Sequence, residues 1–152
     1  MIDEILAEFL QSGLGIHFGT RNEQLEPAGC RAAAVKVEGD GRHVVVYLPK
    51  AASPQVFGNL RTNGHAAVSM ARPTDDRAVQ LKGLMLFSWD AKPEEEHLAR
   101  AQWNGFLGQL DAIGLPGAAT SSWKIFPCVA VRIKVTAVFN QTPGPDAGGA
   151  LS

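Results

Sequence analysis

The stretch CRAAAVKVEGDGRHVVVYL, residues 30–48, holds two runs of small, apolar and β-branched side chains on either side of an acidic, glycine-rich turn. Valine and tyrosine, which fill the second run, are favoured in strands. The turn contains Asp40-Gly41, and an Asp-Gly pair between two strand-like runs is a strong hairpin signal. The stretch therefore predicts two antiparallel strands, 30–37 and 42–48, joined by a tight turn.

Outward from this hairpin, four further segments alternate apolar with polar or small residues at the two-residue period of a half-buried strand. They are residues 14–20, 65–71, 77–89 and 129–139. Gly83 lies inside the third segment, where a glycine is typical of a bend or bulge. Together with the hairpin, these segments predict six strands.

Three segments carry helical signals. Residues 2–10 place apolar side chains at helical spacing behind an acidic first turn. Residues 53–64 open on a serine cap and a proline and close on a glycine, which is the usual punctuation of a short helix. Residues 93–110 begin with proline and three glutamates and predict the longest helix.

Six strands with turns between most of them and helices at the periphery predict a mainly β fold, a closed or nearly closed barrel. Residues 1–140 are expected to form this single domain. Residues 141–152 are rich in glycine and proline, so no regular element is expected there. This tail either crosses to a partner subunit or extends freely.

Composition excludes several classes of function. The 152 residues are 45% hydrophobic and 19% charged, as in folded globular domains. A formal net charge of -1 provides no overall positive field to gather nucleic acid or an anionic membrane. Cys30 and Cys128 lack metal or disulfide spacing. The acidic N-terminus, and apolar runs far shorter than the ~20 residues of a membrane span, favour a cytoplasmic protein.

The four histidines are scattered over separate predicted elements, and none has a second histidine or a cysteine at ligand spacing. No metal site is therefore expected. The sequence also lacks the Gly-x-Ser-x-Gly elbow and any Cys-His pairing, so hydrolase chemistry has no support. No catalytic residue is identified.

Four segments, taken in order, resemble the pyridoxamine 5'-phosphate oxidase-like family of FMN-binding split barrels. They are PAGCRAAAV at 27–35, HVVVYL at 43–48, SPQVFGNLRTNGHAAVSM at 53–70 and RAVQLKG at 77–83. The likeness covers about residues 10–90. It implies a six-stranded split barrel that works as a homodimer, with FMN at the subunit interface and a small-molecule substrate.

The resemblance also implies roles for single residues. Arg31 matches the strand arginine near the cofactor phosphate, and a guanidinium suits a phosphate because its fork donates two hydrogen bonds. Ala32, Ala33 and Ala34 fall where family members let the backbone approach the flavin ring. The plainer alternatives are a surface arginine at a strand end and tight packing of the alanines inside the barrel.

The segment after the hairpin departs from the family pattern. Where family members hold the phosphate with an arginine-lysine cluster, this chain reads KAASPQV at 50–56. Lys50 and Ser53, with the free amides that begin the helix, are the expected substitutes, unless Ser53 is simply a cap. Gln80 is the expected replacement for a family glutamine that touches the ring, or it bonds only to neighbouring backbone.

Removing one charge-assisted contact to a phosphate costs about 1.5–3 kcal/mol, so the departure leaves three hypotheses open. The first is an FMN-dependent oxidoreductase. The second is a non-catalytic split barrel, such as a stress-related ligand-binding protein, that has lost tight FMN binding. The third is the same barrel with haem or a deazaflavin, with His17 and His65 as the haem candidates. Pyridoxine phosphate oxidase activity itself is not expected, because the family's C-terminal Arg-x-His arrangement is missing.

Overall fold

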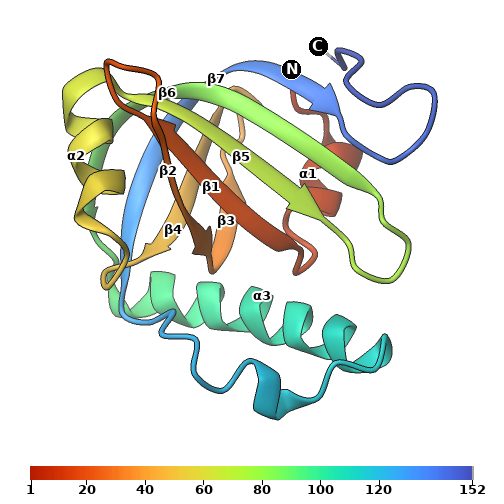
Figure 1. Ribbon diagram of the computed structural model, residues 1–152. Coiled ribbons are helices and arrows are strands. Elements are labelled where there is room, and N and C mark those ends of the chain that lie inside the picture. The colour runs from red at the N-terminus through yellow and green to blue at the C-terminus, as the bar shows by residue number, and fades with distance from the viewer. Residues whose placement is uncertain (152) are drawn as a thin grey trace.

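A computed structural model describes residues 1–151, which form one seven-stranded antiparallel sheet with three helices at its periphery (Figure 1). The sheet order is β2-β1-β5-β6-β7-β4-β3. The strands are β1 Gly15–Arg21, β2 Pro27–Ala32, β3 Ala34–Val37, β4 His43–Pro49, β5 His65–Ala71, β6 Ala78–Asp90 and β7 Cys128–Asn140. The helices are α1 Glu4–Leu10, α2 Pro54–Asn63, α3 Pro93–Ala112 and the short 3-10 helix η1 Gly117–Ala119.

The two edge strands of the sheet, β2 and β3, are consecutive in the chain and meet at Ala33. The single strand predicted over 30–37 is therefore wrong as one element, and the sheet has seven strands rather than six. Its first half pairs with β1 and its second half with β4, because the chain bends at Ala33. This bend curls the sheet into the expected barrel and leaves it split at one seam.

The predicted hairpin is confirmed, since β3 and β4 pair with Ala34 opposite Tyr47. Gly83 also lies at a register shift in the β6–β7 ladder, as its position predicts. A Cβ atom at residue 83 would overlap the carbonyl oxygen of Lys134, so the close approach of the two backbones requires glycine there.

Two apolar clusters hold the fold together. One fills the barrel and includes Phe18, Val46 and Leu81, each almost fully buried. The other lies between α3 and the barrel, where Tyr47 donates its hydroxyl hydrogen to Glu95 at 3.1 Å. Gln102 of α3 receives a hydrogen bond from the Val35 amide at 3.1 Å and donates one to the Val35 carbonyl at 2.7 Å. Helix α3 is thus fixed beside the strand seam (Figure 1).

The C-terminal tail folds back along β7 of its own chain (Figure 1). The Leu151 amide donates to the Val138 carbonyl at 2.8 Å, and the Asn140 amide donates to the Gly149 carbonyl at 2.8 Å. Phe139 and Ala150 form an isolated antiparallel bridge. Among residues 1–151, no helix combines the length and the apolar character that crossing a membrane requires.

Candidate functional site: a cationic groove on the outer face of the sheet

A row of polar side chains crosses four neighbouring strands. The register places Arg31 of β2 opposite His17 of β1, His17 opposite Ser69 of β5, and Ser69 opposite Gln80 of β6. Their neighbour Phe18 points into the barrel core, so this row lies on the outer face. The Gln80 side-chain amide donates to the Ser69 hydroxyl at 3.0 Å, which fixes the two side chains together.

The next row along the same face has almost no side chains. Gly29, Gly19 and Ala67 face one another across β2, β1 and β5. A Cβ atom at Gly29 would lie 2.9 Å from the Phe18 carbonyl oxygen, so packing itself requires that glycine. At Gly19 the nearest atom would be 3.8 Å away, so nothing in the described chain requires a glycine there. A strand glycine that no neighbouring atom requires is typical of a place where a ligand approaches the backbone.

Both rows line one cavity of about 590 Å³, which we call the sheet cavity. A second cavity of about 410 Å³, the loop cavity, lies between the segment 49–52 and the segment 122–125. Cys30 and Arg31 line both cavities, so the two form one groove with Arg31 at the junction. No acidic residue lines either cavity.

Arg31 is half-buried and lacks a carboxylate partner: in residues 1–151 none lies within 4.0 Å of its guanidinium. Its guanidinium carbon instead lies 4.6 Å from the centre of the Trp123 indole and 5.2 Å from the centre of the Phe106 ring. Burial lowers the pKa of Arg31, but an arginine keeps its charge under all ordinary conditions. The groove therefore holds a positive charge that lies against aromatic faces and is not neutralised by a carboxylate in the described chain.

His17 is the titratable neighbour of this charge. Its Nε2 atom lies 3.5 Å from a terminal guanidinium nitrogen of Arg31. Burial lowers the pKa of His17, and the positive charge of Arg31 lowers it further. The imidazole is therefore neutral at pH 7 and accepts from the guanidinium. Burial also raises the pKa of Cys30 to about 11, so its thiol stays protonated.

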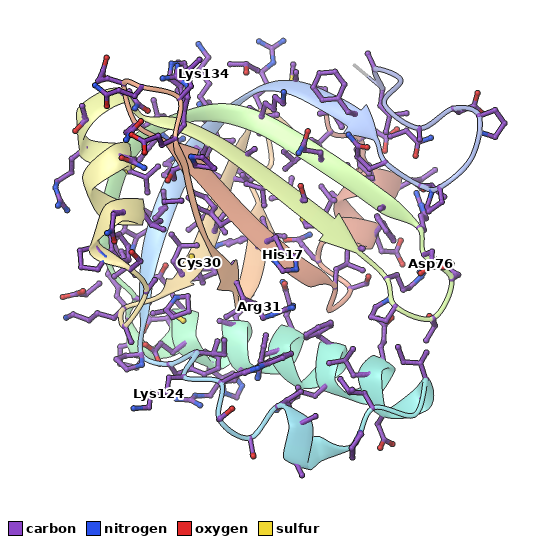
Figure 2. The ribbon with its side chains drawn as sticks, in the orientation of Figure 1. His17, Cys30, Arg31, Asp76, Lys124 and Lys134 are labelled. Atoms are coloured by element: carbon purple, nitrogen blue, oxygen red, sulfur yellow. The ribbon has the colours of Figure 1, made fainter. Side chains whose placement is uncertain are left out.

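The loop cavity adds a second cation. Lys124 lines it together with Ser122 and Trp123, all from the segment that leads into β7. Figure 2 shows His17 and Arg31 between the sheet and α3, with Lys124 below them on that segment. Nothing in the linear sequence indicates this group, because residues 122–124 lie in an irregular segment about 90 positions after Arg31.

The structure brings together only two of the residues predicted for the site. Arg31 and Gln80 line the sheet cavity. The predicted ring contacts Ala32, Ala33 and Ala34 are at most 1% exposed and pack in the apolar clusters, so a ligand on the outer face would not reach their methyl groups.

The two remaining predicted phosphate ligands lie outside the groove. The Lys50 ammonium pairs with Asp90 at 3.2 Å rather than lining either cavity. The Ser53 hydroxyl caps α2, where it accepts from the Gln55 amide at 3.3 Å and contacts the Gln55 side chain. The cap that the sequence predicts at Ser53 is therefore present.

No protein-family model matches this sequence. No curated protein matches it either. Solved structures do. An F420 reductase superposes with a TM-score of 0.58 at 17% identity, covering 86% of this chain and 94% of that one. An FMN-binding protein from Syntrophomonas wolfei subsp. wolfei gives 0.57 at 13% identity, covering 91% and 87%. A protein related to general stress protein 26, of the pyridoxinephosphate oxidase family, from Clostridium acetobutylicum, gives 0.52 at 13%, covering 90% and 84%.

The chain adopts the split-barrel fold of these structures. Its likeness to these structures extends over nearly the whole chain, including α3 and β7, which lie beyond the segments that carry the sequence resemblance. At these low identities the likeness establishes the split barrel alone, and the groove must be judged from its own residues.

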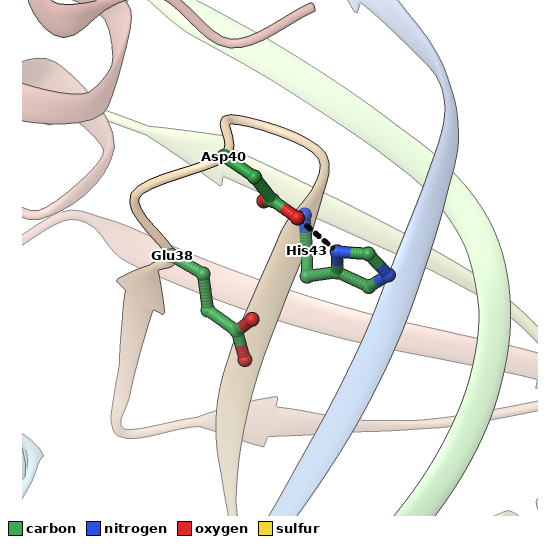
Figure 3. A group of neighbouring side chains, drawn as sticks. All are labelled: Glu38, Asp40 and His43. Atoms are coloured by element: carbon green, nitrogen blue, oxygen red, sulfur yellow. Dashed lines mark hydrogen bonds and ion pairs between the residues drawn. The ribbon is translucent and has the colours of Figure 1, made fainter.

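A separate cluster at the β3–β4 turn, Glu38, Asp40 and His43, brings three possible metal-ligand atoms within 4.8 Å of one another (Figure 3). Its members already have partners. Arg132 donates two hydrogen bonds to the Glu38 carboxylate, both at 2.8 Å. Asp40 receives hydrogen bonds from the Arg42 and His43 amides and contacts the imidazole at 2.6 Å, which holds its pKa at about 2. The cluster stabilises the turn of the hairpin.

Proposed function

We propose that this split barrel binds a flavin or deazaflavin cofactor in the groove around Arg31 and acts as an oxidoreductase on a small molecule. The observation that carries the proposal is the acid-free groove itself, in which a half-buried, unpaired Arg31 lies beside the bare backbone of Gly19. A groove with positive charge at one part and flat backbone at another suits a ligand with an anionic group and a planar ring. FMN has both.

The residues present fit such a cofactor. Arg31 would hold the phosphate with charge-assisted hydrogen bonds. The surface of Gly19, Gly29 and Ala67 would carry the ring, and the linked Ser69 and Gln80 side chains would offer hydrogen bonds to its polar edge. The flavin supplies the redox chemistry when bound.

His17 carries the one imidazole that lines the groove, and because burial and the charge of Arg31 lower its pKa, its ring is in the neutral form that can accept a proton. We propose that His17 handles the proton that accompanies substrate oxidation or reduction. The neutral imidazole is also the form that binds iron, so haem is the second candidate ligand of this groove.

We further propose that the active form is a homodimer with the cofactor between subunits. A third cavity, also about 590 Å³, continues the sheet cavity and shares Gly19 and Ala67 with it. Strand β6 beside it exposes Leu84, Leu86 and Phe87 at 38%, 46% and 53%. Open cavities and exposed apolar side chains on one sheet favour coverage by a second copy. Multi-angle light scattering should give twice the mass of the chain, and a monomer would contradict the proposal.

The test of cofactor class is the visible spectrum of the purified protein after gel filtration, following incubation with FMN, a deazaflavin or haem. A flavin or deazaflavin band that travels with the protein is expected. A haem band instead would support the second candidate. Retention of none of the three would contradict cofactor binding and leave the non-catalytic barrel.

A further inference from the structure

We propose that Lys124 is the second cation of a phosphate-monoester site shared with Arg31, and that it takes the place of the arginine-lysine cluster missing after β4. The ligand class is a phosphate monoester, of which FMN is one. The inference rests on the proposed function for the identity of the natural ligand, but the anion site is testable without a flavin.

The loop cavity is lined by two cations. Arg31 and Lys124 line the same loop cavity, and no acidic residue lines it. Neither cation has a carboxylate within 4.0 Å in the described part of the chain. The chain has more acidic than basic residues overall, 15 against 14, so two free cations around one cavity are a local departure from its average. A phosphate monoester is close to dianionic at pH 7 and matches two positive charges.

Packing fixes the segment that carries Lys124. The residues on either side of Lys124 are anchored, since Ile125 is 6% exposed and the Trp123 ring lies against Arg31 and, at 5.9 Å, against Trp103 of α3. The contact between Trp123 and Arg31 therefore holds the segment that carries Lys124 against the loop cavity that Arg31 also lines. Ser122 lines the same cavity and adds a hydroxyl donor.

Lys50 differs from Lys124 in its pairing. The Lys50 ammonium pairs with Asp90, and the Lys50 side chain lines neither part of the groove. Lys50 and Lys124 are both exposed lysines in segments that border the loop cavity. They differ in whether a carboxylate already neutralises them, and this makes Lys50→Ala a matched control for Lys124→Ala.

The deciding experiment measures dissociation constants of FMN and of riboflavin, which lacks the phosphate, for the full chain and both variants. Lys124→Ala should weaken FMN about tenfold and riboflavin less than about twofold, as loss of one charged contact to the phosphate requires. Lys50→Ala should leave both unchanged. Equal weakening of both flavins by Lys124→Ala, no weakening of either, or an FMN-specific loss in Lys50→Ala would overturn the inference.

A second readout needs no flavin. Phosphate bound between Arg31 and Lys124 would alter the contact of Arg31 with Trp123, so inorganic pyrophosphate at constant ionic strength should change the tryptophan fluorescence of the full chain. The apparent affinity should fall severalfold in Lys124→Ala but not in Lys50→Ala. If the chain binds neither flavin, the proposed function fails and this titration still decides the anion site. Absence of any pyrophosphate effect, or one identical in all three proteins, would contradict it.

Discussion

Two segments border the lower part of the groove, and each supplies a lysine and a serine: 49–53 brings Lys50 and Ser53, and 122–125 brings Ser122 and Lys124. In the first segment the lysine pairs with Asp90 and the serine caps α2. In the second, both side chains line the loop cavity beside Arg31. The two segments thus differ in whether their lysine already has a carboxylate partner in the described chain, and this is why the proposed phosphate contact is assigned to Lys124 and not to Lys50.

The largest expected effect on flavin binding comes from a residue that lies in neither segment. Gly19→Val should reduce binding of FMN and of riboflavin by about a hundredfold or more, because a branched side chain would occupy the surface that carries the ring. The melting temperature should hold or rise, since the new Cβ has no neighbour closer than 3.8 Å and valine is favoured in strands. Flavin titration and thermal unfolding check the pair of outcomes.

Gly29→Val is the control for that variant, because its Cβ would clash with the Phe18 carbonyl oxygen and should lower the melting temperature instead. Unchanged flavin binding by a folded Gly19→Val protein would place the ring elsewhere.

Reversing the charge of each lysine should separate their effects on FMN affinity. Lys124→Glu should weaken FMN about thirtyfold, because it removes an attraction and adds a repulsion next to Arg31, whereas Lys50→Glu should change it less than about twofold. Isothermal titration at low and at physiological salt measures both, and the Lys124 effect should shrink as salt rises. A larger loss of FMN affinity in Lys50→Glu than in Lys124→Glu would assign the phosphate contact to Lys50 instead.

The dependence on pH is expected to be smaller and to come from His17. In the free protein burial and Arg31 lower the His17 pKa, and a bound phosphate would offset Arg31 and raise it. Binding then takes up a proton, so the wild type should gain FMN affinity relative to His17→Gln, by no more than about tenfold, as pH falls through the range between the bound and free His17 pKa values. Titration of the His17 ring signal by NMR, with and without pyrophosphate, checks the sign. A pKa that falls on binding would contradict the arrangement.

The smallest effect is expected from breaking the ion pair between Lys50 and Asp90. Both of its side chains are largely exposed, 57% for Lys50 and 71% for Asp90. Asp90→Asn should therefore change the free energy of unfolding by less than about 1 kcal/mol, measured by urea denaturation. FMN affinity should stay the same. A marked gain in affinity would show that a freed Lys50 can reach the phosphate.

The strand pattern predicted the barrel because alternation along 14–20, 65–71, 77–89 and 129–139 indicates a sheet with one buried and one exposed face, and the turns and peripheral helices favour closing such a sheet on itself. The bend at Ala33 was not predictable. Four small or apolar residues in a row continue the strand pattern on both sides, and the bend arises only when two halves of one segment pair with different strands.

The site was less predictable than the fold. Arg31 is predicted from the family resemblance. Gly19 and Ser69 are recognised as site residues only once the strand register places them near Arg31. Lys124 lines the same cavity as Arg31 because the segment around Trp123 packs against the guanidinium. Such proximity between distant segments leaves no periodicity in the chain, whereas a local feature such as the Ser53 cap can be recognised from neighbouring residues.

The most direct measurement is the FMN dissociation constant of wild type, Arg31→Ala and Arg61→Ala, the last removing an exposed arginine from the final turn of α2. We expect saturable binding by the wild type, a loss of about thirtyfold or more in Arg31→Ala, and no change in Arg61→Ala. Equal affinity of Arg31→Ala and wild type, with both proteins folded, would remove Arg31 from the site and contradict the account.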